Sequence, residues 1–440
     1  MNYNLTEIVN GLRVITIPMP SLESVTVSVW VKTGSRNENK KNNGISHFLE
    51  HMFFKGTKNR PTAKQIAEEI DQIGGVQNAG TSKEYTEYYI KCRADKIEVA
   101  FDLLSDMTLN SLLDSKEIER EKGTIIEEIR MYEDTPMISI GEVFESLIYS
   151  GHSLGMDIAG TEKTVKGMKR QDFLDYRTNF YNPENMIITV AGGVTENKVN
   201  ELAAKYFEKL QTNINFASGV IANKVKQSQI QIATSLKLPR NDIAPKIKLH
   251  NKKKEQTHVI LGFIADGKAY KNKYAQTLLA TILGGGMSSR MFTEVRERRG
   301  LAYSIRTSMD RYTDTGYIGT YAGLDTKRAV EAVKVMLQQH YEITNNKQQI
   351  TKEELIKSKE FLKGHLALAL EDTSDVSSFF GDQELFSEKV LTPEEIFKKI
   401  DKVTMDEVNF EVKRLFVPAR CNLAIIGPYE SDEEFSKIIN

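Results

Sequence analysis

Two apolar runs of the same kind occupy corresponding places in the two halves of the chain. Residues 25–31 are rich in β-branched side chains, and residues 257–263, which begin 232 positions later, have a similar pattern. Each run ends in a polar turn that contains glycine, and a helical pattern follows. The N-terminal residues 3–17 also alternate between polar and apolar positions, which predicts a strand. Both halves are therefore expected to contain strands followed by helices.

Further echoes between the halves keep nearly the same spacing. The tripeptide Glu-Asp-Thr at 133–135 recurs at 371–373. The segment 180–188 resembles 415–423, with the two prolines 235 positions apart. Each echo is weak alone, but their common order and offset predict an internal duplication. Strand runs lie beside helical segments without strict βαβ alternation, which favours an α+β fold in which mainly antiparallel sheets are covered by helices.

The length of the chain points to more than one domain. A chain of 440 residues is too long for one ordinary hydrophobic core. Residues 211–246 are polar, contain small residues and two prolines, and separate strand-like pieces from one another. We therefore predict a first half at 1–210, a linker at 211–246 and a homologous second half at 247–440.

Composition and charge exclude several classes of protein. The chain is 40% hydrophobic and 27% charged, with a net charge of -1, whereas dedicated binders of nucleic acid or anionic membranes carry a basic excess. We expect neither nucleic acid nor membrane as a partner. No apolar run approaches the roughly 20 residues that span a bilayer, and the N-terminus lacks the pattern of a signal peptide. A cytoplasmic location is therefore expected, and Cys92 and Cys421 are expected to be buried thiols rather than a disulfide.

The segment His47-Phe48-Leu49-Glu50-His51 has the pattern of a catalytic zinc site. Histidines four positions apart lie on one face of a helix, where both imidazoles can turn toward one ion. The order His-x-x-Glu-His is the inverse of the commoner His-Glu-x-x-His arrangement. Apolar residues surround the motif, and burying its titratable groups without a partner would cost several kcal/mol, on the order of the penalty for unpaired buried polar groups. A metal ion would supply that partner.

A third protein ligand is required, because catalytic zinc sites use three protein ligands and leave a fourth position open. Residues 114–117 have the pattern of a capping box, and an apolar stripe at helical spacing follows from residue 118 to 132. At about 100° per residue, Glu121 and Glu128 fall along one edge of this stripe, whereas Glu127 points to the opposite side. We predict Glu128 as the third ligand, Glu121 as a carboxylate that hydrogen-bonds the site, and Glu127 as solvent-exposed.

These motifs resemble those of the pitrilysin and mitochondrial-processing-peptidase type of zinc metallopeptidases, the inverzincins. In that family a glutamate ligand follows the second histidine after 77 positions, which is the position of Glu128 here. Residues 74–82 resemble the strand with which family members pair substrate backbone, which implies that Asn78 and Ala79 bind substrate. Arg296 and Tyr303, seven positions apart in the second half, match the family's substrate-clamping arginine and tyrosine. The resemblance covers essentially the whole chain.

The resemblance implies a zinc endopeptidase with one Zn²⁺ per chain, whose two halves face each other around a chamber. Zinc held by His47, His51 and Glu128 would activate water, and Glu50 would act as general base. Unfolded or short peptides are the expected substrates. Similar bacterial proteins pair as homodimers or with an inactive homologue, so a homodimer or heterodimer is expected. Two alternatives stay open: a non-catalytic structural or partner-dependent subunit, and a zinc enzyme that acts on non-peptide amides.

The second half has a glycine run, Gly284 to Gly286, in place of the zinc motif, so only the first half is expected to hold metal. The run follows a helical pattern rather than a strand and lacks the Gly-Lys-Ser/Thr ending of a phosphate-binding loop. We therefore reject nucleotide binding at this place. The glycines are expected to let the backbone approach a peptide or a neighbouring subunit.

Overall fold

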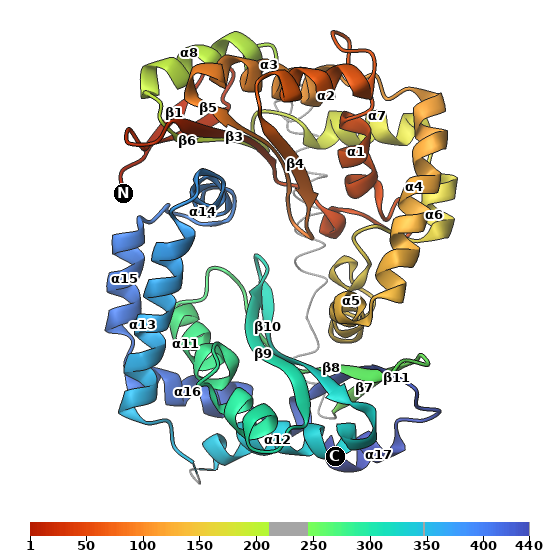
Figure 1. The fold of residues 1–440 in the computed structure, drawn as a ribbon, viewed down its shortest axis with the longest axis vertical. Coiled ribbons are helices and arrows are strands. Elements are labelled where there is room, and N and C mark those ends of the chain that lie inside the picture. Colours follow the sequence, from red (N-terminus) through yellow and green to blue (C-terminus); the bar gives the residue numbers. More distant parts are fainter. Residues whose placement is uncertain (211–244, 346–347, 440) are drawn as a thin grey trace, which may run out of the picture. The chain divides into compact units, whose positions relative to one another are not determined.

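The computed structural model describes residues 1–210, 245–345 and 348–439, which form two compact units (Figure 1). Of the described residues, the first unit comprises 1–131, 156–210 and 368–392, and the second comprises 132–155, 245–345, 348–367 and 393–439. The sequence predicts the contiguous halves 1–210 and 247–440. In the structure, residues 132–155 of the first half belong to the second unit, and residues 368–392 of the second half belong to the first unit. Residues 211–244 of the predicted linker lie outside the described residues, and Lys246 already begins a strand. The expected chamber between the halves stays a prediction.

The first unit is built on a six-stranded sheet in the order β1-β2-β6-β3-β5-β4. Only the pair β2 and β6 is parallel, and the other neighbours are antiparallel. Its strands are β1 Asn4–Glu7, β2 Arg13–Pro18, β3 Ser24–Val31, β4 Val76–Thr81, β5 Thr86–Arg93 and β6 Met186–Gly192. Its helices are α1 Ile45–Phe53, α2 Ala63–Gln72, α3 Ile97–Asn110, α4 Ser115–Asp134, α6 Glu162–Gly167, α7 Arg170–Phe180, α8 Glu196–Phe207 and α14 Thr373–Phe386.

The second unit is built on a five-stranded sheet in the order β7-β11-β8-β10-β9, in which only β7 and β11 are parallel. Its strands are β7 Lys246–Asn251, β8 Gln256–Asp266, β9 Ala302–Arg311, β10 Thr315–Asp325 and β11 Asn422–Gly427. Its helices are α5 Pro136–Ile148, α11 Lys273–Gly284, α12 Ala329–Thr344, α13 Lys352–Ala369, α15 Pro393–Lys402, α16 Met405–Leu415 and α17 Glu433–Ile439. The end of helix α4, from Tyr132 onward, belongs to this second unit. The last two residues of α13 belong to the first unit.

Strand register supports the predicted duplication. In the first sheet, Trp30 on β3 pairs with Ile187 on β6. In the second sheet, Gly262 on β8 pairs with Asn422 on β11. Gly262 comes 232 positions after Trp30, and Asn422 comes 235 positions after Ile187, which are the offsets of the sequence echoes. The two sheets therefore share their strand order and their pairing, apart from the additional edge strand β1.

Each sheet is covered on one face by several helices of its own half and on the other face by one helix from the other half. The large core of the first unit lies between its sheet and helices that include α1, α3, α7 and α8. The opposite face of that sheet contacts α14, which follows the second Glu-Asp-Thr sequence (Figure 1). Conversely, α5, which follows the first Glu-Asp-Thr sequence, packs on β8 and β11 of the second sheet. The repeated tripeptide thus lies close to two of the places where the chain passes from one unit to the other.

Helices α14 and α5 each pack on a sheet where a glycine faces a large aromatic ring. The glycine belongs to the helix in the first unit and to the strand in the second. In the first unit, a Cβ placed on Gly381 of α14 would lie 2.6 Å from Cε2 of Trp30, so the helix has no side chain where the strand has an indole. In the second unit, a Cβ placed on Gly262 of β8 would lie 2.7 Å from Cζ of Phe144 on α5. Protein interiors are close-packed, so a large side chain on one element requires a small one on its partner.

We expect Gly381→Ala to destabilise the chain by about 1–3 kcal/mol, because the added methyl group would overlap the Trp30 ring in a filled core. The matched control is Gly364→Ala on α13, where a Cβ would meet no atom within 4 Å. That control should stabilise the chain by about 1 kcal/mol through helix propensity. Urea unfolding midpoints measure both effects, and equal shifts for the two variants would contradict the packing argument.

The structure corrects two smaller sequence expectations. Residues 3–17 form two strands rather than one, because Gly11 adopts φ 86° and turns the chain between β1 and β2. Asn10 and Gly11 form a dipeptide that favours such turns. The glycine run also serves the chain's own packing, since a Cβ on Gly284 would lie 2.4 Å from the backbone nitrogen of Thr307 on β9. At Gly284, the backbone that approaches is therefore that of the neighbouring strand β9.

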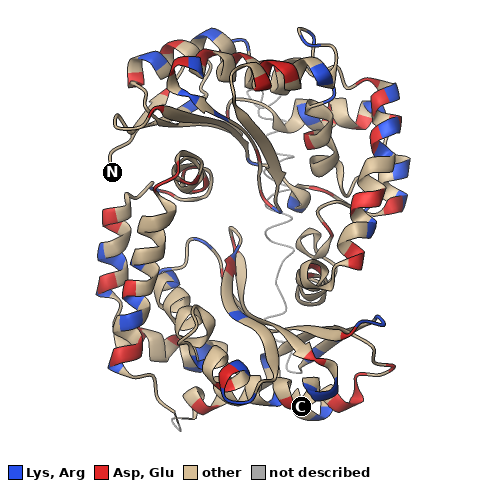
Figure 2. Ribbon diagram, in the orientation of Figure 1, with Lys and Arg blue, Asp and Glu red and all other residues tan. Residues whose placement is uncertain are grey.

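Charged residues of both signs are interspersed along the outer helices, and they alternate clearly along α4 and α15 (Figure 2). This mixture agrees with the near-zero net charge of the chain. Among the described residues, no helix is both long enough and apolar enough to cross a membrane. Both cysteines are buried free thiols, as the sequence predicts.

Candidate metal centre

Helix α1 carries the motif and starts from an unusual cap. Gly44 at its N-cap adopts φ 97°, and a Cβ there would lie 2.6 Å from the carbonyl oxygen of Ala159, so only glycine fits. Glycine has no side chain with which to cap the helix, and Glu38 takes this role. Its buried carboxylate accepts hydrogen bonds from the backbone nitrogens of Gly44 (2.7 Å) and Ser46 (2.9 Å) and from the Ser46 hydroxyl (2.7 Å). Burial raises the pKa of Glu38, although these hydrogen bonds oppose that shift.

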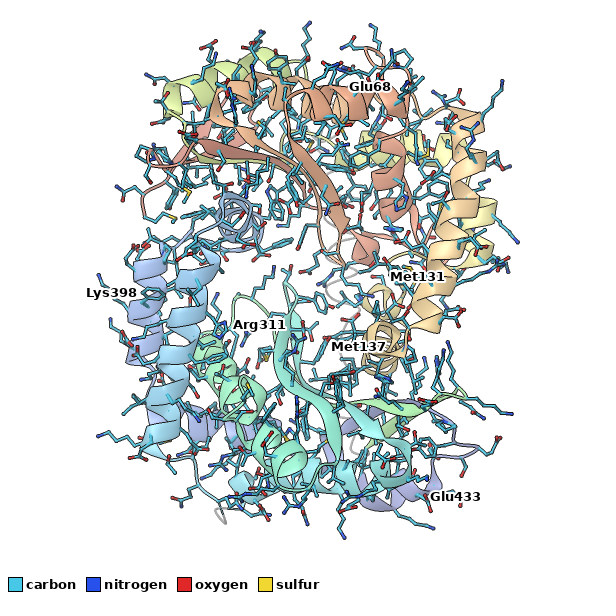
Figure 3. All side chains as sticks on the ribbon, in the orientation of Figure 1. Glu68, Met131, Met137, Arg311, Lys398 and Glu433 are labelled. Atoms are coloured by element: carbon cyan, nitrogen blue, oxygen red, sulfur yellow. The ribbon has the colours of Figure 1, made fainter. Side chains whose placement is uncertain are left out.

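We expect Glu38→Ala to lower the free energy of unfolding by roughly 2–4 kcal/mol, because it leaves several buried donors at the start of α1 without an acceptor. The matched control is Glu68→Ala on α2, whose side chain is 51% exposed and lies at the surface (Figure 3). Thermal unfolding of both variants measures the difference. A Glu38→Ala protein as stable as the control would show that α1 does not depend on this cap.

His47, His51 and Glu128 converge on one point in the first unit. The Nε2 atoms of His47 and His51 lie 3.2 Å apart. A carboxylate oxygen of Glu128 lies 3.7 Å from Nε2 of His47, and the other lies 3.5 Å from Nε2 of His51. Zinc bonds of about 2.0–2.1 Å at tetrahedral angles place ligand atoms about 3.3 Å apart, so this donor set has the spacing that a zinc ion needs. In the described part of the chain, these residues form the one such cluster of three.

The other nitrogen of His51 is held by Glu121. Nδ1 of His51 donates to the Glu121 carboxylate at 2.9 Å, and Lys55 lies 2.7 Å from the other oxygen of that carboxylate. A proton on Nδ1 leaves Nε2 with a lone pair for a metal, which is the common arrangement of metal-binding histidines. Nδ1 of His47 is buried and has no hydrogen-bond partner within the described residues.

The carboxylates around His51 also set its proton affinity. Burial lowers the pKa of His51, but the hydrogen bond with Glu121 and the charges of Glu50 and Glu128 outweigh burial, so the pKa lies above its ordinary value. Burial would raise the pKa of Glu121, but its bonds with His51 and Lys55 outweigh burial and lower that pKa. The group of carboxylates thus favours a positive charge at His51, whether a proton or a metal ion supplies it.

Glu50 lies on the same helix as the two histidines, and its carboxylate is held from the sheet. The hydroxyl of Thr81, at the end of β4, donates to Oε2 of Glu50 at 2.6 Å. Among the described residues, β4 pairs with β5 alone and forms an edge of the sheet, as expected for residues 74–82. Asn78 and Ala79 lie in the middle of this strand. The strand that holds the Glu50 carboxylate through Thr81 is therefore also an edge strand of the described sheet.

Arg296 and Tyr303 both belong to the second unit and lie next to each other. Arg296 lies on a π-helical turn, Phe292–Glu297, and its guanidinium stacks 4.8 Å from the Phe292 ring centre and 5.8 Å from that of Tyr303. π-helical turns occur frequently at functional sites. Tyr303, on β9, is 77% exposed. The clamping role of both residues at the metal centre stays a prediction.

Sequence reasoning placed some neighbours of the site and missed others. The side chain of Glu127 is 71% exposed and that of Glu121 is 5% exposed, as the helical wheel predicts. Thr81, Lys55 and Glu38 were not anticipated. Lys55 lies two positions after the last residue of α1, so helical spacing does not place it. The contacts of Thr81 and Glu38 depend on the approach of a strand and a loop, for which the sequence carries no local signal.

Family comparisons cover most of the chain. Residues 13–162 match the family described as Insulinase (Peptidase family M16), and residues 167–362 match the Peptidase M16 inactive domain. The uncharacterized zinc protease YmxG of Bacillus subtilis (strain 168) is 37% identical over 420 residues, which cover 95% of this chain and 97% of that protein. An uncharacterized zinc protease of Mycobacterium leprae (strain TN) is 34% identical over 426 residues, which cover 97% of this chain and 92% of that protein.

Two solved structures share the fold over nearly the whole chain. A protease from Helicobacter pylori matches with a TM-score of 0.85 at 23% identity, covering 97% of this chain and 99% of that chain. A protein from Pseudomonas fluorescens, described as a peptidase M16 inactive domain, matches with a TM-score of 0.84 at 16% identity, covering 98% of this chain and 99% of that chain. These likenesses confirm the predicted α+β fold of two halves, each a sheet covered by helices.

Proposed function

Since the chain belongs to the insulinase family of peptidases, M16, we propose that it is a zinc-dependent endopeptidase that hydrolyses unfolded or short peptides and holds one zinc ion. The observation that carries the proposal is the convergence of His47, His51 and Glu128 beside Glu50. Two neutral imidazoles and one carboxylate make a donor set that suits zinc and leaves a fourth position for water.

The chemistry divides between the metal and Glu50. A zinc ion at this centre would lower the pKa of a bound water toward neutrality and polarise the peptide carbonyl. Glu50 accepts the proton of the attacking water and then delivers it to the leaving amine. The hydrogen bond from Thr81 holds one oxygen of Glu50, which leaves the other oxygen for the proton. Glu121 orients His51 through Nδ1.

Substrate binding is assigned to residues from both units. An extended peptide adds to the edge strand β4 at Asn78 and Ala79 through main-chain hydrogen bonds. This mode requires an unfolded segment, which favours short or unfolded substrates over folded proteins. Tyr303 binds the oxyanion that forms at the scissile carbonyl, and Arg296 binds the substrate backbone. We also propose that the chain pairs with a chain of the same fold, as a homodimer or a heterodimer. We propose neither nucleic acid nor a membrane as a partner.

The test is a peptidase assay on the purified chain together with its metal content. We expect about one zinc ion per chain and cleavage of a quenched peptide library that stops with chelator and returns with added zinc. Cleavage sites read by mass spectrometry would define the specificity. A chain that binds zinc but cleaves nothing alone, and that gains activity when a homologous chain is added, would be a partner-dependent subunit. A chain without zinc and without activity would contradict the proposal and favour a structural role.

A further inference from the structure

A cavity in the second unit is not used by the proposed chemistry. It has a volume of about 650 Å³, a size typical of small-ligand sites, and lies between the start of α5 and one face of the sheet. Met137 and Ile138 of α5 line it and are 60% and 49% exposed. Figure 3 labels Met137 on this helix. All of its lining residues belong to the second unit.

Small residues on both walls produce this hollow. On α5, a Cβ placed on Gly141 would meet no atom within 4 Å. On the sheet, Gly319 of β10 pairs with Ser308 of β9, so two neighbouring strands present little side-chain volume to the cavity. Ile260 and Tyr317 supply apolar walls. The cavity therefore follows from residue size at defined positions of the helix and the sheet.

The cavity contains an arginine that makes no hydrogen bond or ion pair with the described residues. Ser304, Arg306, Ser308 and Asp310 alternate along β9, so their side chains share the sheet face that lines the cavity. Asp310 accepts a hydrogen bond from the Ser308 hydroxyl at 3.1 Å. Arg306 is exposed, and its guanidinium makes no hydrogen bond or ion pair within the described residues. Asp310 lies four strand positions from Arg306, about 13 Å along the backbone. Burial raises the pKa of Asp310, and the Ser308 hydrogen bond and the positive charge of Arg306 oppose that shift.

We propose that this cavity is a subsite for peptides in which an apolar side chain lies next to a carboxylate. The apolar side chain fills the space between Met137, Ile260 and Tyr317, and the carboxylate pairs with Arg306. Arginine suits this role because its planar guanidinium binds carboxylates through two hydrogen bonds. The carboxylate comes either from an acidic side chain or from the end of the peptide. This assignment rests on the proposed peptidase function and adds a substrate class to it.

Peptide binding to the full chain tests the subsite without hydrolysis. The protein is the Glu50→Gln variant, and the probe is a fluorescein-labelled heptapeptide of glycine and serine with a central Leu-Glu pair and an amidated end. Fluorescence anisotropy should give at least tenfold tighter binding for Leu-Glu than for Leu-Gln or Ser-Glu. A second probe that ends in leucine with a free carboxylate, compared with its amide, shows whether the chain end serves as the carboxylate. Equal affinities for all probes would overturn the proposal.

Three substitutions connect the binding to the cavity. Arg306→Gln should remove the preference for the carboxylate, whereas Arg420→Gln, at an exposed arginine of the same unit, should leave it unchanged. Gly141→Leu should fill the cavity and weaken the Leu-Glu probe at least tenfold, and an unchanged or higher melting temperature would show that the fold is intact. A carboxylate preference that survives Arg306→Gln, or binding that survives Gly141→Leu, would refute the assignment.

The outcome is separable from that of the proposed function. Zinc content and cleavage by the unmodified chain decide whether the chain is a peptidase, and neither measurement depends on Arg306. Arg306-dependent binding in a chain that cleaves nothing would keep the subsite and reject the peptidase. Cleavage by a chain that binds all probes equally would keep the peptidase and reject the subsite.

Discussion

Replacing Glu50 with glutamine is expected to abolish peptide hydrolysis while the metal stays bound. Glu50 is adjacent to His51 in sequence, but its carboxylate accepts a hydrogen bond from Thr81 and does not belong to the group of converging ligand atoms. Glutamine keeps the size of the side chain and can accept the same hydrogen bond, but it cannot take a proton from water. General acid–base catalysis contributes typically 10²- to 10⁴-fold, so the turnover number should fall by roughly that factor.

Activity and metal content must be measured together for this variant. Zinc content by atomic spectroscopy should match that of the unmodified chain, and hydrolysis of a quenched peptide should fall to near background. Thr81→Val serves as a second variant, since it removes only the hydroxyl that holds Glu50 and should reduce turnover less than the loss of the carboxylate. Full activity in the Glu50→Gln protein would show that another group moves the proton.

Replacing Glu128 with glutamine is expected to weaken zinc binding rather than to block proton transfer. Glu128 supplies the one carboxylate of the ligand set, and its oxygens lie 3.7 Å and 3.5 Å from the two imidazole nitrogens. A neutral amide is a poorer ligand for a dication. Loss of an outer partner of a metal ligand typically costs 10–100-fold in affinity, and the loss of a charged ligand should cost at least about 100-fold.

The preceding residue provides a closely matched control. Glu127 lies on the same helix, but its side chain is 71% exposed and pairs with Arg130 across 2.6 Å at the surface. Glu127→Gln should therefore leave zinc affinity and activity unchanged. Competition with a chromogenic chelator measures the affinity of both variants. Equal zinc affinities for Glu127→Gln and Glu128→Gln would remove Glu128 from the ligand set.

Much of the metal centre was predictable because it depends on local periodicity. The spacing of His47 and His51 places both on one face of α1, and the wheel of residues 118–132 separates Glu128 and Glu121 from Glu127. Helical geometry repeats so regularly that spacing alone tells which side chains share a face. The residues that hold these groups could not be predicted in this way, because Thr81 and Glu38 lie on a strand and a loop outside the helices.

The sequence by itself determined the alternation of strands and helices, the duplicated framework and the residues able to bind one metal ion, since all three follow from short-range spacing or from repeats at a constant offset. Tertiary structure alone decided that α5 and α14 each pack on the sheet of the other half, because the spacing of apolar residues does not show which sheet a helix covers. Local complementarity makes that choice: Gly381 fits beneath Trp30, and Phe144 fits above Gly262. Two other small residues, Gly141 and Gly319, line the cavity beside Arg306, which no spacing rule would reveal.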